Sequence, residues 1–402
     1  MADFLHGVEV IEIDDGLRPI QSIATGIIGV VGTAPGADPD AFPLNTPVLI
    51  AGSRREAAKL WVAPAEGQPA SPKGTLPAAL DGIFDQAGAV VVVVRVAADE
   101  DEEGTLANII GGTNATTGDF EGVHALLGAE AAVGVRPRIL IAPGFTHQIL
   151  EADTANPVAA EMLGIADRMR AVVLIDGPNT TDAAAISAAG AYGSPRAYII
   201  DPWVKVLDST GAIVVEPASA RVAGLIAKTD AEVGVHQSPS NRPINGILGT
   251  ARAVDFTLGD ASSRANLLNE ANVATIIRQD GFRLWGNRSL SSDPKWQFLC
   301  VRRTADLIND SLQRAHLWAV DRAITRNYAD DVSESVNAYL ASLQAQGVII
   351  GGRCWVDPDL NTPATLANGE VYFDFDFTAP YPAEHITFRS RLTTDYLEEM
   401  LA

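Results

Sequence analysis

The stretch Val90–Val96, with the sequence VVVVVRV, is the most informative segment for the fold class. β-Branched residues favour extended structure, and an apolar run without alternation indicates a strand that is covered on both faces. The surrounding apolar run, from Ala87 to Val94, ends at Arg95, and its eight residues are far too few to cross a membrane. The stretch therefore predicts a buried strand in a sheet with helices on both sides.

Similar apolar runs recur on either side of Val90–Val96 and alternate with stretches of helical pattern. This alternation is typical of an α/β domain with a mostly parallel sheet, which we place at residues 22–238. The predicted strands are Ile27–Val31, Val48–Ala51, Val90–Val96, Ile139–Ala142, Val172–Ile175 and Ala197–Ile200. The predicted helices are Ser53–Trp61, Leu76–Gln86, Pro157–Arg170, Asp182–Ala191 and Ser219–Glu232.

Residues 239–383 have a different pattern, which is typical of an α+β domain. A long helix is expected at Thr304–Arg326 and a second one at Asp331–Gln346, and strands follow them. The predicted strand Glu370–Phe377 has an acidic polar face, whereas the polar face of Glu384–Leu392 is basic. Two strands with such matched alternation could pair with each other.

The N-terminal residues 1–21 have the pattern of an extended arm. In a short strand, Val8 and Val10 point to one face and Ile11 and Ile13 to the other, so both faces need cover. That cover could come from the domain that follows or from another chain, and the pattern alone favours neither.

The composition excludes several classes of protein. The chain has 402 residues, 47% hydrophobic and 20% charged, which is typical of an ordered protein of two or three domains. Its net charge of -21 argues against nucleic-acid binding and against an anionic membrane surface. Two cysteines, Cys300 and Cys354, cannot form a disulfide framework, which indicates a reducing compartment. Residues 1–15 lack the pattern of a signal peptide.

The usual signatures of an enzyme are missing. There is no phosphate-binding loop, and Gly26, Gly29 and Gly32 have the wrong spacing for a dinucleotide site. Asp176 and Asp201 follow predicted strands and could hold a metal or a ribose, but aspartate at a strand end more often starts a turn. The histidines and cysteines show no ligand or nucleophile spacing. We therefore predict no catalytic residue, no metal and no cofactor.

The segment Arg278–Arg326 is basic in an otherwise acidic chain, with nine basic residues against five acidic ones, or +4. In the predicted helix, Arg303 and Arg314 lie nearly opposite the apolar stripe, as do Asp310 and Asp321. This arrangement fits a solvated face with an Asp310–Arg314 pair. It also fits a basic surface that faces an acidic partner.

A family resemblance is strongest in residues 241–310. The stretches NRPING (241–246), LLNEANV (267–273), GFRLWGNRSL (281–290), DPKWQF (293–298) and VRRTADLI (301–308) closely resemble the tail sheath proteins of contractile-tailed bacteriophages and R-type bacteriocins. FLHGV (4–8), GVVGTAP (29–35) and PAEHI (382–386) look like the same family. The resemblance is weak over residues 60–235.

The resemblance implies a structural subunit with an outer α/β domain at 22–238 and an inner α+β domain at 239–383. Residues 1–21 and 384–402 would be extended arms that add strands to neighbouring subunits. Six-subunit rings would stack around a tail tube and contract to drive it through the host envelope. The partners would be the chain itself, the tube protein, and the baseplate and tail terminator proteins, without nucleic acid or membrane insertion. Subunits would assemble in the host cytoplasm and reside in the virion tail.

Three sets of residues are expected to make the contacts of such a subunit. The arm contacts are Val8, Val10, Ile11, Ile13, Ile386, Phe388 and Leu392, and the tube-facing candidates are Arg302, Arg303 and Arg314. Trp285, Gly286, Asn287 and Arg288 should hold a turn, since they offer a large anchor, backbone freedom and a forked donor.

Two other interpretations stay open. An α/β enzyme that handles nucleotides or sugar phosphates could occupy residues 22–238, although its phosphate loop would be missing. The chain could also be a baseplate subunit or another component of an injection system.

Overall fold

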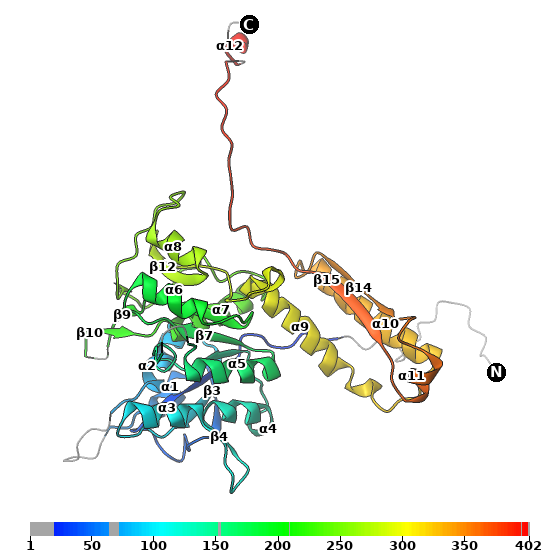
Figure 1. Cartoon of the computed structure of the whole chain (residues 1–402), viewed down its shortest axis with the longest axis horizontal. Helices are drawn as coiled ribbons and strands as arrows, with labels where there is room; N and C mark the ends of the chain where they lie inside the picture. Colours follow the sequence, from blue (N-terminus) through cyan, green and yellow to red (C-terminus); the bar gives the residue numbers. More distant parts are fainter. Residues whose placement is uncertain (1–19, 64–71, 152–153, 209, 395, 401–402) are drawn as a thin grey trace, which may run out of the picture.

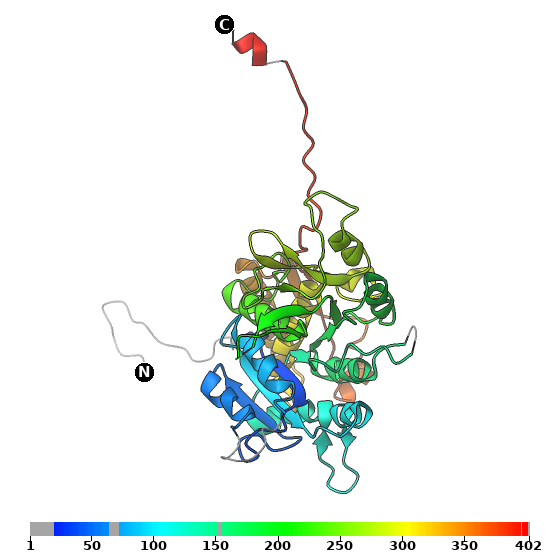
Figure 2. The same ribbon diagram turned by 90° about the vertical axis from the view of Figure 1, so that its left-hand side faces the viewer.

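The computed structural model describes residues 20–63, 72–151, 154–208, 210–394 and 396–400. A large α/β body carries a narrower extension, which is built from two long helices and a hairpin (Figure 1). A second view shows the C-terminal segment leaving the body as extended chain (Figure 2). In these described ranges, no helix is both long and apolar enough to cross a membrane.

One eight-stranded sheet organises the body, in the order β13-β12-β8-β7-β6-β1-β3-β2. Neighbouring strands from β12 to β3 run parallel, and the edge strands β13 and β2 pair antiparallel. The strands are β1 (Ile28–Thr33), β2 (Pro47–Ala51), β3 (Val90–Val96), β6 (Ile139–Ile141), β7 (Val172–Asp176), β8 (Ala197–Ile200), β12 (Val273–Arg278) and β13 (Phe282–Trp285).

Helices cover both faces of this sheet, as the valine run predicts. Val91 and Val93 of β3 point into one core, together with α2 (Leu76–Phe84) and α7 (Ser219–Glu232). Alternate side chains of the same strand, among them Val92, point into the core on the other face. That core includes residues of α3 (Glu102–Ile110), α5 (Pro157–Met169), α6 (Asp182–Gly190) and α8 (Arg264–Glu270).

The body also contains short elements that connect or flank the sheet. A three-stranded antiparallel sheet has the order β10-β9-β11, and β4 pairs with β5. These elements are α1 (Arg54–Ala57), η1 (Ala58–Leu60), β4 (Gly112–Thr113), β5 (Phe120–Glu121), η2 (Gly122–Gly128), α4 (Ala129–Val133), β9 (Val204–Leu207), β10 (Ile213–Glu216), β11 (Gly249–Thr250) and η3 (Pro294–Trp296).

The fold is mixed α/β, with a mostly parallel sheet and small antiparallel sheets. The strands and helices predicted within residues 22–238 are confirmed to within a few residues at their ends. The sheet continues past residue 238, however, because β12 pairs with β8 and brings β13 with it. The division into domains stays a prediction.

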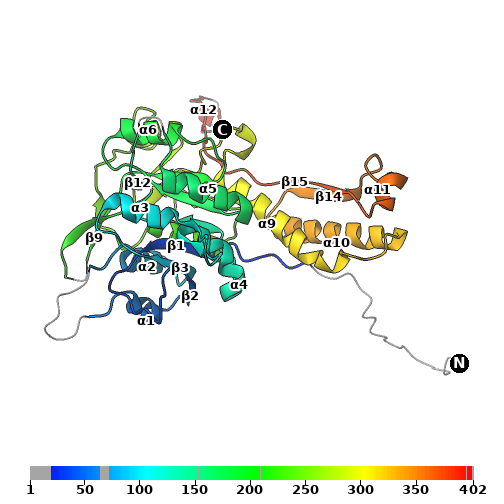
Figure 3. The same ribbon diagram turned by 60° about the horizontal axis from the view of Figure 1, so that its bottom comes forward.

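The extension consists of α9 (Leu299–Ala315), η4 (Leu317–Ala319), α10 (Arg326–Ala345) and the antiparallel hairpin of β14 (Gly351–Val356) and β15 (Phe373–Thr378). The short helix α11 (Pro363–Ala367) lies between the two strands in sequence, and α12 (Tyr396–Glu399) lies near the C-terminus. The hairpin lies over α10 (Figure 3). Alternate phenylalanines of β15 pack against the apolar side of α10, where Val336, Leu340 and Leu343 are buried.

Two predictions for the extension are wrong. The helix expected at residues 304–326 ends at Ala315, and the chain turns at Asp321, which has a left-handed φ of 63°. Beyond Ala315 the expected stripe offers only alanines, whereas Leu317 and Val320 are exposed, so too little apolar surface is buried to continue the helix. β15 pairs with β14 and not with residues 384–392, although those residues lie closer along the chain. The β14–β15 hairpin packs on α10 and so covers the phenylalanines of β15.

Asp176, at the end of β7, anchors the start of α7. Its completely buried carboxylate accepts hydrogen bonds from the backbone N–H of Ser219 (2.8 Å) and from the Ser219 hydroxyl (2.6 Å). Burial raises the pKa of Asp176 to about 6, although the hydrogen bonds from Ser219 act in the opposite direction. Both carboxylate oxygens therefore have hydrogen-bond partners within the chain.

We expect Asp176→Asn to change how stability depends on pH. The folded pKa of about 6 lies above the unfolded value of about 3.9, so this group stabilises the fold fully below about pH 4 and loses that effect as the pH rises through 6. The variant should therefore gain roughly 2 kcal/mol relative to wild type between pH 4.5 and 7. Urea unfolding across this range measures the difference.

Asp182→Asn is the matched control with the opposite sign. Hydrogen bonds from Arg264 and Arg252 lower the pKa of Asp182, so its stabilising effect is present at neutral pH and is lost as the pH falls. This variant should lose stability relative to wild type as the pH rises to about 4, and the difference should stay level between pH 4.5 and 7. Parallel curves for wild type and Asp176→Asn would show that Asp176 does not titrate in this range.

Candidate functional site

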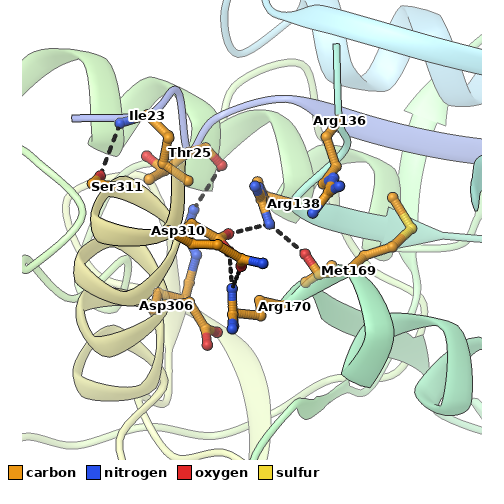
Figure 4. Close-up of polar contacts among 12 residues, drawn as sticks. Ile23, Thr25, Arg136, Arg138, Met169, Arg170, Asp306, Asp310 and Ser311 are labelled. Carbon is orange, nitrogen blue, oxygen red and sulfur yellow. Dashed lines mark hydrogen bonds and ion pairs between the residues drawn. The ribbon is translucent and has the colours of Figure 1, made fainter. Parts of the chain in front are cut away.

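Helix α9 is the first element of the extension, and the side that it turns to the body is charged. Arg303, Asp306 and Asp310 are all buried there, which is uncommon for charged residues unless they are paired. The close-up shows how α9 meets the N-terminal segment and the start of two strands (Figure 4). We call this contact the α9 joint.

Asp306 is the first anchor of the α9 joint. Arg196, which directly precedes β8, donates from both terminal nitrogens to the two oxygens of Asp306 at 2.6 and 3.1 Å. Burial lowers the pKa of Arg196, but the hydrogen bonds and charge of Asp306 outweigh it, so the net shift is upward. Arg302 donates to the same carboxylate at 2.7 Å, and its guanidinium lies 4.2 Å from the centre of the Trp296 ring.

Asp310 is the second anchor, one helical turn further along α9. Its carboxylate, with a side chain only 4% exposed, pairs with both Arg138 and Arg170. Arg138 directly precedes β6, and Arg170 caps the end of α5 just before β7. Burial lowers the pKa of Arg138, although Asp310 opposes this shift. Arg170 also donates to Gln313 at 2.6 Å.

The third anchor also holds the N-terminal segment in place. Arg303 pairs with Asp230 of α7, with hydrogen bonds of 2.6 and 2.7 Å, and donates to the carbonyl of Thr25 at 3.1 Å. The hydroxyl of Thr25 donates to Asp230 at 2.6 Å. The backbone N–H of Ile23 donates to Ser311 of α9 at 3.2 Å (Figure 4). The segment that leads to the N-terminus is therefore fastened between α9 and the body.

The partners of α9 share one place in the fold, although they are far apart in sequence. Three arginines lie just before β6, β7 and β8: Arg138, Arg170 and Arg196. Because these strands are parallel neighbours, the arginines lie at the same end of the sheet, where the strands begin. Sequence reasoning missed these three residues and Asp230. The signal that could have found them is an arginine one or two residues before three successive predicted strands. Because neighbouring parallel strands begin at the same end of a sheet, residues just before them lie side by side.

The three arginines expected to face the tube lie in different surroundings. Arg303 is 6% exposed and paired with Asp230, and Arg302 is partly buried against Asp306 and Trp296. Arg314 is exposed. The expected Asp310–Arg314 pair does not form, because Asp310 is taken by Arg138 and Arg170. A tube-facing role for the three arginines stays a prediction.

The Trp285–Arg288 turn links the sheet to α9. Gly286 has a φ of 138°, and a side chain there would come within 2.8 Å of the Ala274 backbone. Its carbonyl accepts a hydrogen bond from buried Tyr198 at 2.7 Å, and Asn287 accepts from the N–H of Leu299 at 3.1 Å.

The turn is also tied to aromatic side chains and to the root of the C-terminal segment. Trp285 packs edge-on against Phe256, with ring centres 4.9 Å apart. Arg288 pairs with Glu384 and lies over the Phe298 ring. These contacts are all within the chain, which fits the predicted holding role.

The predicted arm contacts at the C-terminus lie on open chain. Ile386, Phe388 and Leu392 are 67%, 92% and 100% exposed. Three large apolar side chains on one face of an extended segment are seldom so exposed unless another surface covers them. Val8, Val10, Ile11 and Ile13 lie outside the described residues.

The other candidate ligand, Asp201, has structural partners. It accepts a hydrogen bond from the N–H of Asn179 at 2.7 Å and pairs with Arg252. Burial raises its pKa, and Arg252 opposes that shift. Within the part of the chain that the structure describes, no group of three or more His, Cys, Asp or Glu residues could hold a metal ion.

We expect Asp310→Ala to destabilise the fold strongly. The substitution leaves Arg138, and to a lesser degree Arg170, buried without a carboxylate, which typically costs about 3–5 kcal/mol. Urea unfolding of the purified chain measures this loss. Asp330→Ala is the matched control, since Asp330 makes only an exposed contact of 3.9 Å with Arg326 and should cost below about 1 kcal/mol. Equal losses for the two variants would contradict the anchoring role of Asp310.

Known protein families and relatives match almost the whole length of the chain. Residues 25–96 match the tail sheath protein Gp18 domain III N-terminal region, residues 118–290 the phage tail sheath protein central domain, and residues 291–393 the phage tail sheath C-terminal domain. A prophage major tail sheath protein of Pseudomonas aeruginosa UCBPP-PA14 is 44% identical over 99% of both chains. The tail sheath protein of Escherichia phage P2 is 38% identical over 100% of this chain and 98% of its own.

Solved structures share the fold at lower identity. The helical sheath of the anti-feeding prophage in its contracted state has a TM-score of 0.70 at 22% identity, and covers 98% of this chain and 100% of its own. The contracted sheath of an extracellular contractile injection system has a TM-score of 0.68 at 19% identity over 99% of both chains. The chain therefore belongs to the phage tail sheath family, as a structural subunit of a contractile tail sheath and not an enzyme.

Proposed function

We propose that the chain polymerises as stacked six-subunit rings around a tail tube, and that the polymer contracts to drive the tube through the host envelope. The subunits would assemble in the host cytoplasm and form the virion tail, in contact with the tube, baseplate and tail terminator proteins. The α/β body would face outward, and the α9–α10 extension with its hairpin would form the inner part. Exchanged arms would join each subunit to its neighbours.

The exposed C-terminal segment is the observation that carries this proposal. It alternates apolar and polar residues as a half-buried strand does, yet residues 384–394 are exposed along their whole described length. Its root is well held, because Ala379 is buried, Tyr381 packs on Phe298 and Glu384 pairs with Arg288. A segment that is anchored at one end and uncovered beyond it fits strand addition to a neighbouring subunit.

The open hairpin supplies a matching acceptor. β14 and β15 form a two-stranded sheet, so each strand has an outer edge without a strand partner in the described part of the chain. Such edges readily accept a further strand, and each added main-chain hydrogen bond contributes about 0.5–1.5 kcal/mol net. The N-terminal arm, with Val8, Val10, Ile11 and Ile13, would use the same principle.

The charged surface of α9 supports a contact with the tube that is easy to release. Arg314 is exposed, so it is the best placed of the three predicted tube-facing arginines, while Arg302 and Arg303 already have partners within the chain. Solvent-exposed ion pairs stabilise a contact by only about 0–1 kcal/mol each. Many such weak contacts together could template an extended sheath on the tube, and each could still break when the sheath leaves the tube surface.

We expect removal of residues 384–402 to give a folded subunit that does not polymerise. Its residues 384–394 are exposed, and the ion pair of Glu384 with Arg288 is partly exposed too, so the fold should survive the loss of the segment. Electron microscopy of negatively stained protein shows whether tubes or rings form.

A shorter truncation, removing residues 395–402, is the matched control. It keeps Ile386, Phe388 and Leu392 and should retain strand pairing, so any loss of polymers is expected to be smaller. Normal tubes from the longer truncation would overturn the arm-exchange proposal.

We expect Arg314→Glu to weaken assembly on the tube more than self-assembly of the sheath. Charge reversal replaces an attraction to an acidic tube surface by repulsion, and added salt should reduce the difference. The fraction of tubes that carry a sheath, counted in micrographs at low and high salt, measures this effect. Arg326→Glu, at a highly exposed position on α10, controls for net charge. Equal sheathing by wild type and Arg314→Glu at low salt would count against Arg314.

A further inference from the structure

A polar cleft of about 520 Å³ lies where the C-terminal segment leaves the body, and its size is typical of a natural binding site. It is lined by residues of the loop 236–243, by Arg283 of β13 and by residues 380–383. This lining includes two arginines, Arg242 and Arg283, and no acidic residue. We call it the basic cleft, which is an exception in a chain with a net charge of -21.

The two arginines of the basic cleft have no carboxylate partner among the described residues. Arg242 donates from Nε to the carbonyl of Ser238 at 3.5 Å. Arg283 donates to two backbone carbonyls, both at 2.9 Å. Burial lowers the pKa of His236, which keeps this ring of the lining neutral at pH 7. The arginines therefore supply the charge of the cleft, and no opposite charge neutralises them.

The acidic run Asp99–Glu103 has the complementary charge. All five residues are exposed, and they lead into α3. Three of the carboxylates accept hydrogen bonds only from uncharged groups of the body. Glu100 and Glu103 have no side-chain partner in the described ranges. The run thus presents five negative charges that the body does not pair.

The acidic run and the basic cleft lie on opposite sides of the body. The run follows β3, whereas Arg283 lies on β13, and six strand spacings of about 4.8 Å, or roughly 29 Å, separate these strands. Figure 1 shows α3 at the end of the body away from the root of the C-terminal segment. One copy therefore cannot bring its own run to its own cleft, whereas the run of one copy can reach the cleft of another.

We propose that the basic cleft of each subunit binds the acidic run Asp99–Glu103 of a second copy of this chain. The inference rests on the proposed polymerisation, and it adds a contact between bodies that does not involve the arms. Ion pairs in a cleft are stronger than on a flat surface, because the walls exclude water.

The proposed contact is head-to-tail, because the run and the cleft are different surfaces. Each bound pair of copies still has an unoccupied cleft at one end and an unbound run at the other. Such a contact continues from copy to copy, and it forms an open helical array wherever the rotation between copies does not close a ring. This behaviour is what a helical polymer of subunits requires.

A charge swap tests the contact through the critical concentration for polymerisation, which light scattering measures. Arg242→Glu should raise this concentration about fivefold at low salt, because an attraction becomes a repulsion, and high salt should reduce the difference. The double variant Glu100→Lys/Glu103→Lys should have the same effect from the other side. The three substitutions together should restore assembly. Arg55→Glu, at an exposed position of α1, is the matched control and should assemble like wild type.

Engineered cysteines test the head-to-tail geometry. A chain with both Arg242→Cys and Glu103→Cys should form a ladder of disulfide-linked multimers under a mild oxidant, since each copy carries both halves of the contact. A mixture of the two single-cysteine variants should stop at dimers. The native Cys300 and Cys354 are buried, so the background should be low. Electrophoresis without reducing agent separates the products.

The outcomes separate this contact from the proposed function. Rescue by the combined charge substitutions, together with the ladder, supports the contact, and circular dichroism of each unpolymerised variant checks the fold. Normal assembly of Arg242→Glu, no rescue by the combination, or tubes of the double-cysteine variant without a ladder overturns the contact and leaves the sheath function standing. Wild-type protein that forms neither tubes nor rings contradicts the proposed function itself, and the contact with it.

Discussion

The buried ion pairs of the α9 joint hold the two parts of this subunit in one arrangement. Removing charges from water is costly, so each buried carboxylate must sit where its arginine can reach it. Asp306 and Asp310 each pair with arginines at the end of the sheet where the strands begin, and Arg303 pairs with Asp230 of α7. Apolar contact alone would tolerate sliding of the helix, whereas these directional pairs define its position and rotation.

The joint also connects the body with both chain ends. Arg303 and Ser311 of α9 hold the last residues of the N-terminal segment, and the turn before α9 holds the root of the C-terminal segment through Arg288. Any force on the proposed arms would therefore reach α9 first. A subunit fastened in this way fits a polymer whose subunits move as rigid bodies and whose interfaces change.

Two parts outside the body lack cover within the described chain. The hairpin has open edges, residues 384–394 expose Ile386, Phe388 and Leu392, and the charges of the two parts are opposite. Within the described chain, β15 does not pair with residues 384–392, although the matched alternation of apolar and polar residues in the sequence suggested that they could pair. Complementary patterns identify strands that can pair, but they do not say whether the pair forms within one chain or between two.

The sequence by itself determined the sheet of the α/β body and the family. Uninterrupted runs such as Val90–Val96 need cover on both faces, and this requirement is local, so the strands and helices of residues 22–238 could be placed from pattern. The WGNR turn was also predictable, because Gly286 must adopt a backbone conformation that other residues avoid. Only the tertiary structure showed that β12 and β13 extend the sheet and that Asp310 pairs with Arg138 and Arg170 instead of Arg314. The sequence alone offers many possible ion-pair partners for a charged residue on a helix. Which of them it meets depends on which distant strands begin at the same end of the sheet.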